Sequence, residues 1–595
     1  MSIDFHSLCI AAKFSTDDII GYLAPSLEAY KGCTIIDVHP GACLWSSKLH
    51  EFLKPKRHIL MEPEMLYYEP FVKPLLEKRG SKYRHTTLIG AHPREYWDNY
   101  RQIFEDKDLV GRPALSLDDP KLREIDTSIL LTGNLWRKYA IMHKTNYADH
   151  STLLLQHMTW AGLTNDIFQR SGLVRQLWWA PDDTKRSIFP TTIRGKRSYD
   201  LGLTMGASIT EVAGVSQVES YKRAAAAESP RPLTMDASVL GRVEQKMAEK
   251  GLVIPPNRTM PHAVEAIKME DNVHVTDSIV ATTCTTIAEL KAAIEKFDAW
   301  LVTISAEIGR AKYQSRSTPR ILEQGLTDDR VAELFKEVVR YKQSIDVVDG
   351  RRPFDHVFIS TLKAYVRVVI IVDLELLMIN LEAEYAAVRD TNPDPDALAA
   401  CRAAIQASSE AVAQLALKNI GDRKRETIRG FIDDVLSVET RPSTLHRDRR
   451  PYEPLQAKPE EFWPQYEVTL LDVMPNTREL SAPGIANRRE GTKICQELLK
   501  YLYHSPSLPI TTALDRIAPN AAQDLIPEVP ALTDARQGGR LDPGQMSVRF
   551  LTSDMVEGIV KAFLEWPFRP STVEMALAQD GGWARDEDEA DGEID

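Results

Sequence analysis

The first 200 residues alternate short apolar runs with stretches of helical periodicity. The apolar runs are rich in β-branched residues and end at Gly, Pro or Asn, which is typical of buried strands. Strands are predicted over residues 34–38, 58–62, 128–135 and 173–180. Between them, apolar residues recur at spacings of three and four, which predicts helices over residues 44–53, 66–78 and 151–168. Such alternation favours an α/β fold with a parallel sheet.

Beyond about residue 205 the apolar positions keep a helical spacing and strand patterns become scarce. Long helices are predicted over residues 281–304, 331–345, 358–389 and 395–420. The first of these has an apolar repeat shorter than three heptads, which favours a core-facing helix over a coiled coil with a partner. Residues 440–485 and 503–545 are rich in Pro and charged residues, which predicts irregular structure.

These patterns predict three parts of the chain. Residues 1–205 form an α/β domain, and residues 206–575 form a mostly helical extension that binds nucleic acid or a partner. Residues 576–595 form an acidic tail that is too polar to build a core.

Charge is distributed unevenly along the 595 residues. The chain has 73 bases and 85 acids, and its formal net charge of -12 argues against a nucleic-acid partner. Residues 1–200 nevertheless carry a net +3, whereas residues 586–595 contain seven acids and no base. The first 200 residues are therefore compatible with a nucleic-acid partner.

Several classes of site lack their sequence patterns. No apolar run reaches 18 residues, so no membrane-spanning segment is expected. The six cysteines contain no C-x-x-C pair and the histidines no H-E-x-x-H pattern, so neither a metal centre nor a disulfide framework is expected. Phosphate-binding P-loop and G-x-S-x-G patterns are also absent.

The first candidate site is a turn that joins the strand at 34–38 to the next helix. Asp37 lies near the end of the strand, Gly41 lies in the turn, and Glu62 ends the following strand, 21 residues after Gly41. In nucleotide-binding α/β folds a glycine lets the backbone approach the ligand, and an acid about 20 residues later accepts hydrogen bonds from ribose hydroxyls. A plain strand-turn-helix corner is the alternative, because only one glycine is present.

The second candidate site lies at the end of the strand at 128–135. Asn134 offers both a donor and an acceptor, and it could hold an exocyclic amine. Leu135 and Trp136 follow it, and Trp136 could stack on a base. The alternative is a strand end at which Gly133 and Asn134 turn the chain and Trp136 fills the core.

The third candidate is a basic strip with aromatic residues around it. Five bases fall within thirteen residues that contain no acid: Lys185, Arg186, Arg194, Lys196 and Arg197. Bases interleaved with aromatic side chains suit phosphates and unstacked nucleobases. A solvated loop is the alternative.

Together these segments resemble the rRNA adenine N6-dimethyltransferase family, and within it the mitochondrial transcription factor B branch in a fungal-like form. The resemblance covers about residues 15–215, through TIIDVHPGACLWSSKLHEFLKPKRHILMEPE, SILLTGNLW and GLVRQLWWAPDDTKRSIFP. It implies a Rossmann-like class I S-adenosylmethionine-dependent methyltransferase domain. It also implies a mitochondrial matrix location, although the N-terminus lacks an Arg-rich targeting pattern.

The resemblance also implies roles for particular residues. The turn from Asp37 to Gly41 would face S-adenosylmethionine, and Glu62 would bind its ribose. Asn134 and Leu135 match the first half of the motif that holds the target adenine. Trp136 and Arg137 stand where the family has Pro and an aromatic residue. No clear acid for the adenine ring of the cofactor follows the strand near residues 86–92.

Two functions fit this pattern of retained and altered residues. The favoured one is a mitochondrial transcription initiation factor that binds single-stranded DNA or RNA and assists the mitochondrial RNA polymerase. The alternative is an S-adenosylmethionine-dependent adenine dimethyltransferase that modifies the RNA of the small ribosomal subunit. A structural role in the mitochondrial ribosome is a third interpretation.

Overall fold

The computed structural model describes residues 9–10, 13–91, 95–135, 147–215, 233–260, 375–391, 394–414, 422–440, 442–481, 488–571 and 574. The helices predicted over residues 281–304 and 331–345 lie outside the described residues. So do Trp136, Arg137 and the acidic tail at 576–595.

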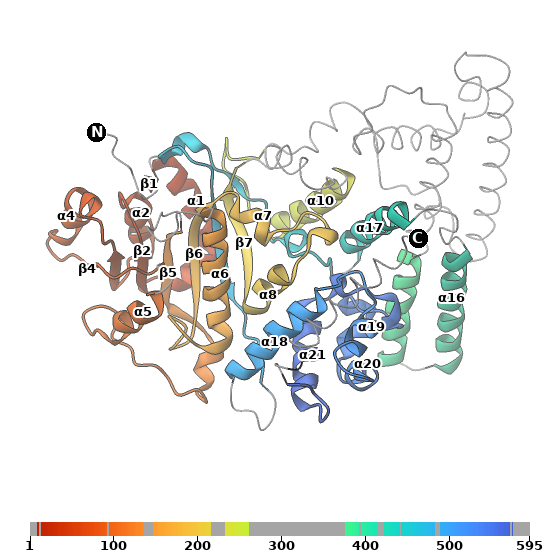
Figure 1. Ribbon diagram of the computed structural model, residues 1–595. Helices are drawn as coiled ribbons and strands as arrows, with labels where there is room; N and C mark the ends of the chain where they lie inside the picture. The colour runs from red at the N-terminus through yellow and green to blue at the C-terminus, as the bar shows by residue number, and fades with distance from the viewer. Residues whose placement is uncertain are drawn as a thin grey trace, which may run out of the picture.

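A mixed eight-stranded sheet forms the centre of the molecule (Figure 1). Its order is β4-β3-β2-β5-β6-β10-β7-β8. The first five strands in this order are parallel, β10 runs antiparallel to both β6 and β7, and β8 is parallel to β7. The strands are β2 (Thr34–Val38), β3 (Arg57–Met61), β4 (Tyr83–Thr86), β5 (Ile125–Asn134), β6 (Leu173–Pro181), β7 (Ala207–Gly214), β8 (Leu455–Gln456) and β10 (Val468–Pro475). The predicted α/β fold is confirmed at this level, as a Rossmann-like sheet with most strands parallel.

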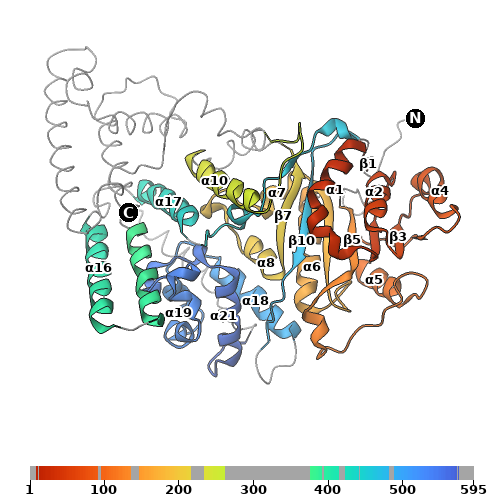
Figure 2. The same ribbon diagram turned by 180° about the vertical axis from the view of Figure 1, so that it is seen from behind.

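Helices cover both faces of the parallel strands, because successive side chains of a strand point to opposite faces. On one face, Ile35 packs in a core with residues of α1 (Lys13–Leu27) and α2 (Leu44–Leu53). On the other face, Ile36 packs in a core with residues of α5 (Tyr96–Glu105) and α6 (Tyr147–Thr164). Figure 2 shows α1 and α2 in front of the sheet, and Figure 1 shows α5 and α6 on the opposite side. Every residue of β2 is buried, which explains its unbroken apolar pattern.

The sheet continues beyond residue 205, where the sequence pattern placed the end of the α/β domain. β7 and β10 are neighbours in the sheet, although residues 215–467 separate them along the chain. The irregular structure expected over residues 440–485 is wrong for β10, whose residues are almost all buried. The α/β part therefore includes three strands, β7, β8 and β10, from the region that was expected to be only a helical extension.

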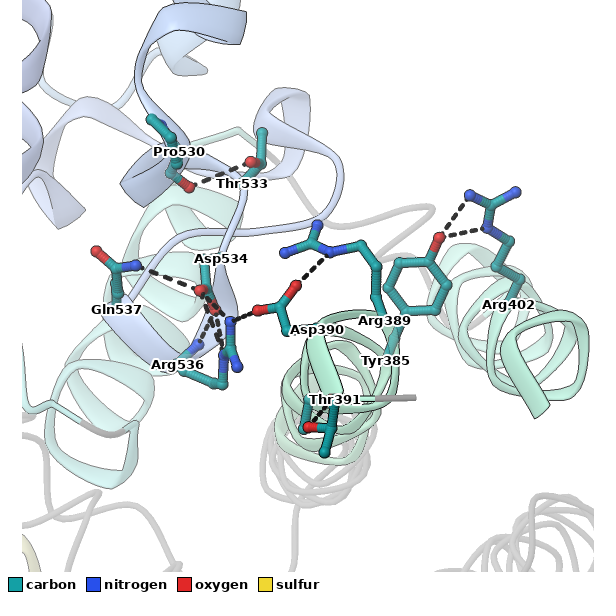
Figure 3. A network of polar contacts seen from close by, with 11 residues as sticks. Tyr385, Arg389, Asp390, Thr391, Arg402, Pro530, Thr533, Asp534, Arg536 and Gln537 are labelled. Atoms are coloured by element: carbon teal, nitrogen blue, oxygen red, sulfur yellow. Dashed lines mark hydrogen bonds and ion pairs between the residues drawn. The ribbon is translucent and has the colours of Figure 1, made fainter. Parts of the chain in front are cut away.

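The inserted residues contribute helices beside the sheet. These are α10 (Leu233–Glu249), a helix over residues 375–391, α16 (Pro395–Gln414) and α17 (Asp422–Glu439). Figure 3 shows the helix at 375–391 meeting the C-terminal part of the chain, where Asp390 pairs with Arg536. A small apolar cluster containing Ile379, Ile432 and Ala535 lies at the same junction.

The C-terminal part is helical and shares a core with the α/β part. Its helices are α18 (Arg488–Leu502), α19 (Ile510–Asp515), α20 (Ala521–Leu525) and α21 (Ser553–Glu565). Their core includes Trp160 and Leu163 of α6 and Leu201 and Met205 of α8 (Ser198–Gly206). The two parts therefore pack as one continuous structure.

Short elements connect these larger ones. They are β1 (Cys9–Ile10), η1 (Glu28–Tyr30), α3 (Met65–Tyr67), η2 (Tyr68–Val72), α4 (Lys73–Leu76), η3 (Pro120–Arg123), α7 (Thr184–Ile188), η5 (Ile193–Gly195), η6 (His446–Arg449), η7 (Pro459–Glu461), β9 (Phe462–Trp463), η8 (Ile526–Glu528), η9 (Pro530–Leu532), η10 (Ala535–Gln537), η11 (Pro543–Gln545) and η12 (Val548–Phe550).

Candidate functional site

The strand register brings Glu62, Asn134 and the turn that contains Gly41 to one edge of the sheet. Val38 lies beside Met61 on one side and beside Gly133 on the other. The residues that follow Met61 and Gly133 are Glu62 and Asn134. Both therefore lie at the carboxyl edge of the parallel strands, where the turn after β2 also lies. The strand order reverses between β2 and β5, and ligands of open α/β sheets bind at such a switch point.

The turn after β2 is compact and tied to β3. The backbone N–H of His39 donates to the carbonyl of Met61 at 3.0 Å, and that of Cys43 donates to Pro40 at 3.0 Å. His39, Gly41 and Cys43 have φ of 56°, 55° and 59°. The left-handed conformation costs about 1–2 kcal/mol for a residue other than glycine. His39 and Cys43 are buried, so the surrounding packing holds them in this conformation.

The Glu62 side chain is fully buried against this turn. One carboxylate oxygen accepts a hydrogen bond from the backbone N–H of Gly41 at 3.3 Å, and the other accepts from that of Glu64 at 3.1 Å. The Glu62 backbone carbonyl also accepts from Nε2 of His85 at 2.8 Å. The structure thus joins Gly41 and Glu62, the two residues whose 21-residue spacing identified them. Both oxygens of the Glu62 carboxylate thus accept hydrogen bonds from backbone amides at this edge of the sheet.

Asp37 is engaged inside the protein. Its Oδ2 lies 3.3 Å from Nε2 of His58, and Nδ1 of His58 lies 3.1 Å from Nδ1 of His50. The two imidazoles stack on the ring of Tyr83. Burial, together with the positive charges of His58 and Lys78, lowers the pKa of His50 to about 4. Sequence reasoning missed this chain, because two histidines eight residues apart carry no recognised pattern.

Close packing of strands positions Asn134 and Leu135. A Cβ on Gly133 would lie 2.5 Å from the carbonyl oxygen of Val38 and 2.9 Å from the Trp178 ring, so β5 approaches β2 as only glycine allows. Asn134, the last residue of β5, is only 6% exposed. The backbone N–H of Leu135 donates to the carbonyl of Trp179 at 2.8 Å. The backbone that carries Asn134 is therefore fixed on both sides.

The basic strip does not form a single exposed surface, because two of its lysines are buried. Nζ of Lys185 pairs with Asp182 at 2.5 Å and with Glu211 at 2.8 Å. Burial alone would lower the pKa of Lys185, but these carboxylates raise it above its ordinary value. Nζ of Lys196 donates to the carbonyls of Arg549 and Leu551 at 3.1 and 2.5 Å. Both amines are thus occupied by the protein itself.

The three arginines of the strip are more accessible. Arg194 is partly exposed and pairs with Asp434 of α17 at 3.5 Å. Arg186 is exposed and pairs with Asp183 at 3.6 Å. Arg197 is exposed at the start of α8. The described structure therefore assigns part of this strip to internal packing and leaves Arg186 and Arg197 at the surface.

Within the described ranges, no group of three or more His, Cys, Asp or Glu side chains could hold a metal ion. In the same part of the chain, no helix is both long and apolar enough to cross a membrane. The chain matches no known family profile and no curated protein.

Proposed function

We propose that the protein is a class I methyltransferase-fold member of the rRNA adenine N6-dimethyltransferase family. The order of the sheet supports this proposal. The strands β4-β3-β2-β5-β6 follow the doubly wound order, and the last strand, β10, runs antiparallel between β6 and β7. A reversed last strand between the fifth and sixth strands is the arrangement of class I methyltransferase sheets. This is an argument from fold, so function depends on the site itself.

The residues at the carboxyl edge fit S-adenosylmethionine. The Glu62 carboxylate, fixed by the Gly41 and Glu64 amides, would accept hydrogen bonds from the ribose hydroxyls. Asn134 would hold the exocyclic amine of an adenine at the end of β5. The cofactor, when bound, supplies an electrophilic methyl group. The contribution of this chain is to position and orient the two ligands.

Within this family, the function we propose is mitochondrial transcription initiation. The protein would bind unpaired promoter DNA in the matrix and assist the mitochondrial RNA polymerase. The observation that carries this choice is a retained fold with an altered site. Asn134 and Leu135 are followed by Trp136 and Arg137 in place of Pro and an aromatic residue. In addition, buried His39 and Cys43 occupy left-handed positions of the cofactor turn that glycine would fill without strain.

The second candidate is an adenine dimethyltransferase of the small ribosomal subunit RNA. The observation that favours it is the contact between Glu62 and Gly41, which keeps the acid at the turn beside Asn134 at the switch point. In this case Asn134 would grip the target amine while the methyl group is transferred.

Three measurements separate the two candidates: binding of S-adenosylmethionine, methyl transfer, and stimulation of the mitochondrial RNA polymerase. Calorimetric titration with S-adenosylmethionine is combined with a methyl-transfer assay on a ribosomal RNA hairpin, using the wild type and Asn134→Ala. The initiation-factor proposal predicts stimulation of polymerase on a pre-melted promoter without methyl transfer. Methyl transfer that depends on Asn134, without such stimulation, would instead establish the enzyme. Failure of all three assays would contradict the family assignment.

A further inference from the structure

A second group of basic residues lies where β3 and β4 begin, apart from the basic strip. Residues 54–84 contain eight bases and four acids, a net +4 in a chain whose net charge is -12. One of the four acids, Glu62, is buried at the candidate site. The exposed bases of this group, which we call the β4 corner, are Lys54, Lys56, Lys78, Arg79, Lys82 and Arg84.

Backbone contacts bring these positions together. The N–H of His58 donates to the carbonyl of Lys82 at 2.9 Å, which aligns the starts of β3 and β4. Lys56 immediately precedes β3, and Lys54 caps the end of α2. The N–H of Ser81 donates to the carbonyl of Lys78 at 2.9 Å, so Lys78 lies in the turn that leads into β4. β4 is the outermost strand of the sheet, far from α17 and the C-terminal helices (Figures 1 and 2).

The charge of the β4 corner is not neutralised within the described part of the chain. None of its six bases forms an ion pair there, whereas other exposed lysines nearby do. Lys31 pairs with Glu28 and Lys73 pairs with Glu69, at 2.8 and 2.9 Å. Glu77 is the exposed acid next to the corner in the chain, and it leaves a clear surplus of positive charge. A cluster of unpaired cations raises the local concentration of polyanions.

Exposed apolar side chains lie in the segment that precedes Lys78 and Arg79 in the chain. The segment of α3, η2 and α4 packs on the sheet through a small core that includes Val72 and Tyr83. The same segment leaves Met65, Leu66 and Phe71 40–60% exposed. Phe71 precedes the bases Lys78 and Arg79 across the single short helix α4. Cations that follow a backbone, together with an aromatic ring for stacking, are the features of single-strand binding surfaces.

We infer that the β4 corner binds the sugar-phosphate backbone of single-stranded nucleic acid, with Phe71 stacking on an unpaired base. This inference rests on the proposed function and specifies where that partner docks. Lys185 and Lys196 of the basic strip are buried, so they cannot contact a nucleic acid. The β4 corner would provide exposed cations in their place. Arg84 lies within β4, and its Nη1 donates to the carbonyls of Ser81 and Tyr83 at 3.4 and 2.8 Å, which keeps its charge at the start of β4 with the other bases of the corner.

The test measures binding of a labelled single-stranded RNA by fluorescence anisotropy over a series of salt concentrations. The corner variant is Lys54→Gln/Lys56→Gln/Lys82→Gln. Its matched control, Lys493→Gln/Lys500→Gln/Lys561→Gln, removes the same charge from α18 and α21. Each lost phosphate contact reduces the magnitude of the slope of log K against log salt by about 0.7. The slope for the corner variant, which lacks three bases, should therefore be smaller in magnitude by about 2 than that of the wild type. Its affinity at low salt should fall by about tenfold or more, while the control should retain both values.

A third variant, Phe71→Ala, separates stacking from charge, because it should weaken binding without changing the salt slope. The inference is overturned if the corner variant binds like wild type, or if corner and control variants lose affinity equally. In both cases a wild-type protein that binds RNA leaves the proposed function standing. A wild type that binds neither RNA nor single-stranded DNA contradicts the proposed function as well. All replaced side chains are exposed or partly exposed, so unchanged thermal melting verifies that each variant is folded.

Discussion

The side chain of Arg194 lies across Gly430, in the middle of α17. A Cβ at position 430 would stand 2.7 Å from Nε of Arg194, closer than packed atoms approach. The same arginine pairs with Asp434, one turn further along α17, and the Asp434 carboxylate also accepts a hydrogen bond from the backbone N–H of Ile193 at 2.7 Å. One arginine of the predicted basic strip thus joins the α/β part to the inserted helices.

Gly430→Ala is therefore expected to bring little of the stability that alanine normally adds to a helix interior. The methyl group displaces the end of the Arg194 side chain and with it the partly exposed pair with Asp434, which costs up to about 1 kcal/mol. Gly241→Ala is the matched control, because Gly241 is exposed in α10 and a Cβ there would have no neighbouring atom within 4 Å. That control should gain about 0.5–1 kcal/mol of helix stability. Urea unfolding of both variants measures the difference, and equal shifts would contradict the Arg194 contact.

The carboxylate of Glu382 is buried where the inserted helix meets the C-terminal part. It pairs with Arg540 at 3.0 Å and accepts from the backbone N–H of Leu541 at 3.0 Å. Arg540→Met should cost about 3–5 kcal/mol, because it leaves a buried carboxylate without its cation. Asp390→Asn removes the exposed pair with Arg536 shown in Figure 3, while Arg536 keeps its pair with Asp534, and it should change stability little. Chemical denaturation of the two variants provides the comparison, and similar losses would show that burial does not set the strength of these pairs.

The strand patterns predicted much of the α/β part, but they did not predict the strand β10, which pairs with β6 and β7. The strand at 34–38 and the helix at 44–53 have the predicted bounds, because a fully buried strand and a one-sided helix leave clear apolar patterns. The irregular segments expected over 503–545 are confirmed in part by short helices and turns. β10 was missed, because its pairing with β6 and β7 depends on contacts across residues 215–467, and no local pattern encodes such contacts.

The candidate site was predictable to a similar extent. Spacing predicted that Gly41 and Glu62 belong to one ligand site, and the structure places them in contact at the carboxyl edge of the parallel strands. Spacing did not predict that Asp37 would face His58 or that Lys185 would face two acids. A charged residue has the same sequence signature whether it meets solvent or a distant partner, so only the tertiary fold distinguishes the two cases.

Lys196 should make the stability of the protein depend on pH. Burial, with the nearby charge of Arg449, lowers its pKa from 10.5 to about 7 in the folded state. The unfolded chain then binds more protons than the folded chain between about pH 7 and 10.5. The contribution of Lys196 to stability therefore rises with pH in this window, by at most about 1.4 kcal/mol per pH unit. As pH falls toward 7, the free energy of unfolding decreases, because the unfolded chain takes up a proton at this amine that the folded chain does not.

The measurement is urea unfolding of wild type and Lys196→Met over that pH range. The variant should lack the rise, because methionine has no proton to release. The groups around Lys196 include Asp200 and His446, and both remain in the variant as an internal control. Parallel pH profiles for the two proteins would show that Lys196 stays charged when buried.

Gly133→Ala tests how strongly packing positions the candidate site. The added methyl group would lie 2.5 Å from the carbonyl oxygen of Val38, so β5 must move away from β2. A loss of about 1–3 kcal/mol is expected from overpacking. Because Asn134 is the next residue, the shift should also weaken binding of adenine-containing ligands at the switch point, whereas Gly241→Ala should leave it unchanged. Unfolding and ligand titration of the same samples separate the two effects. Wild-type binding by a destabilised Gly133→Ala protein would show that Asn134 does not depend on this contact.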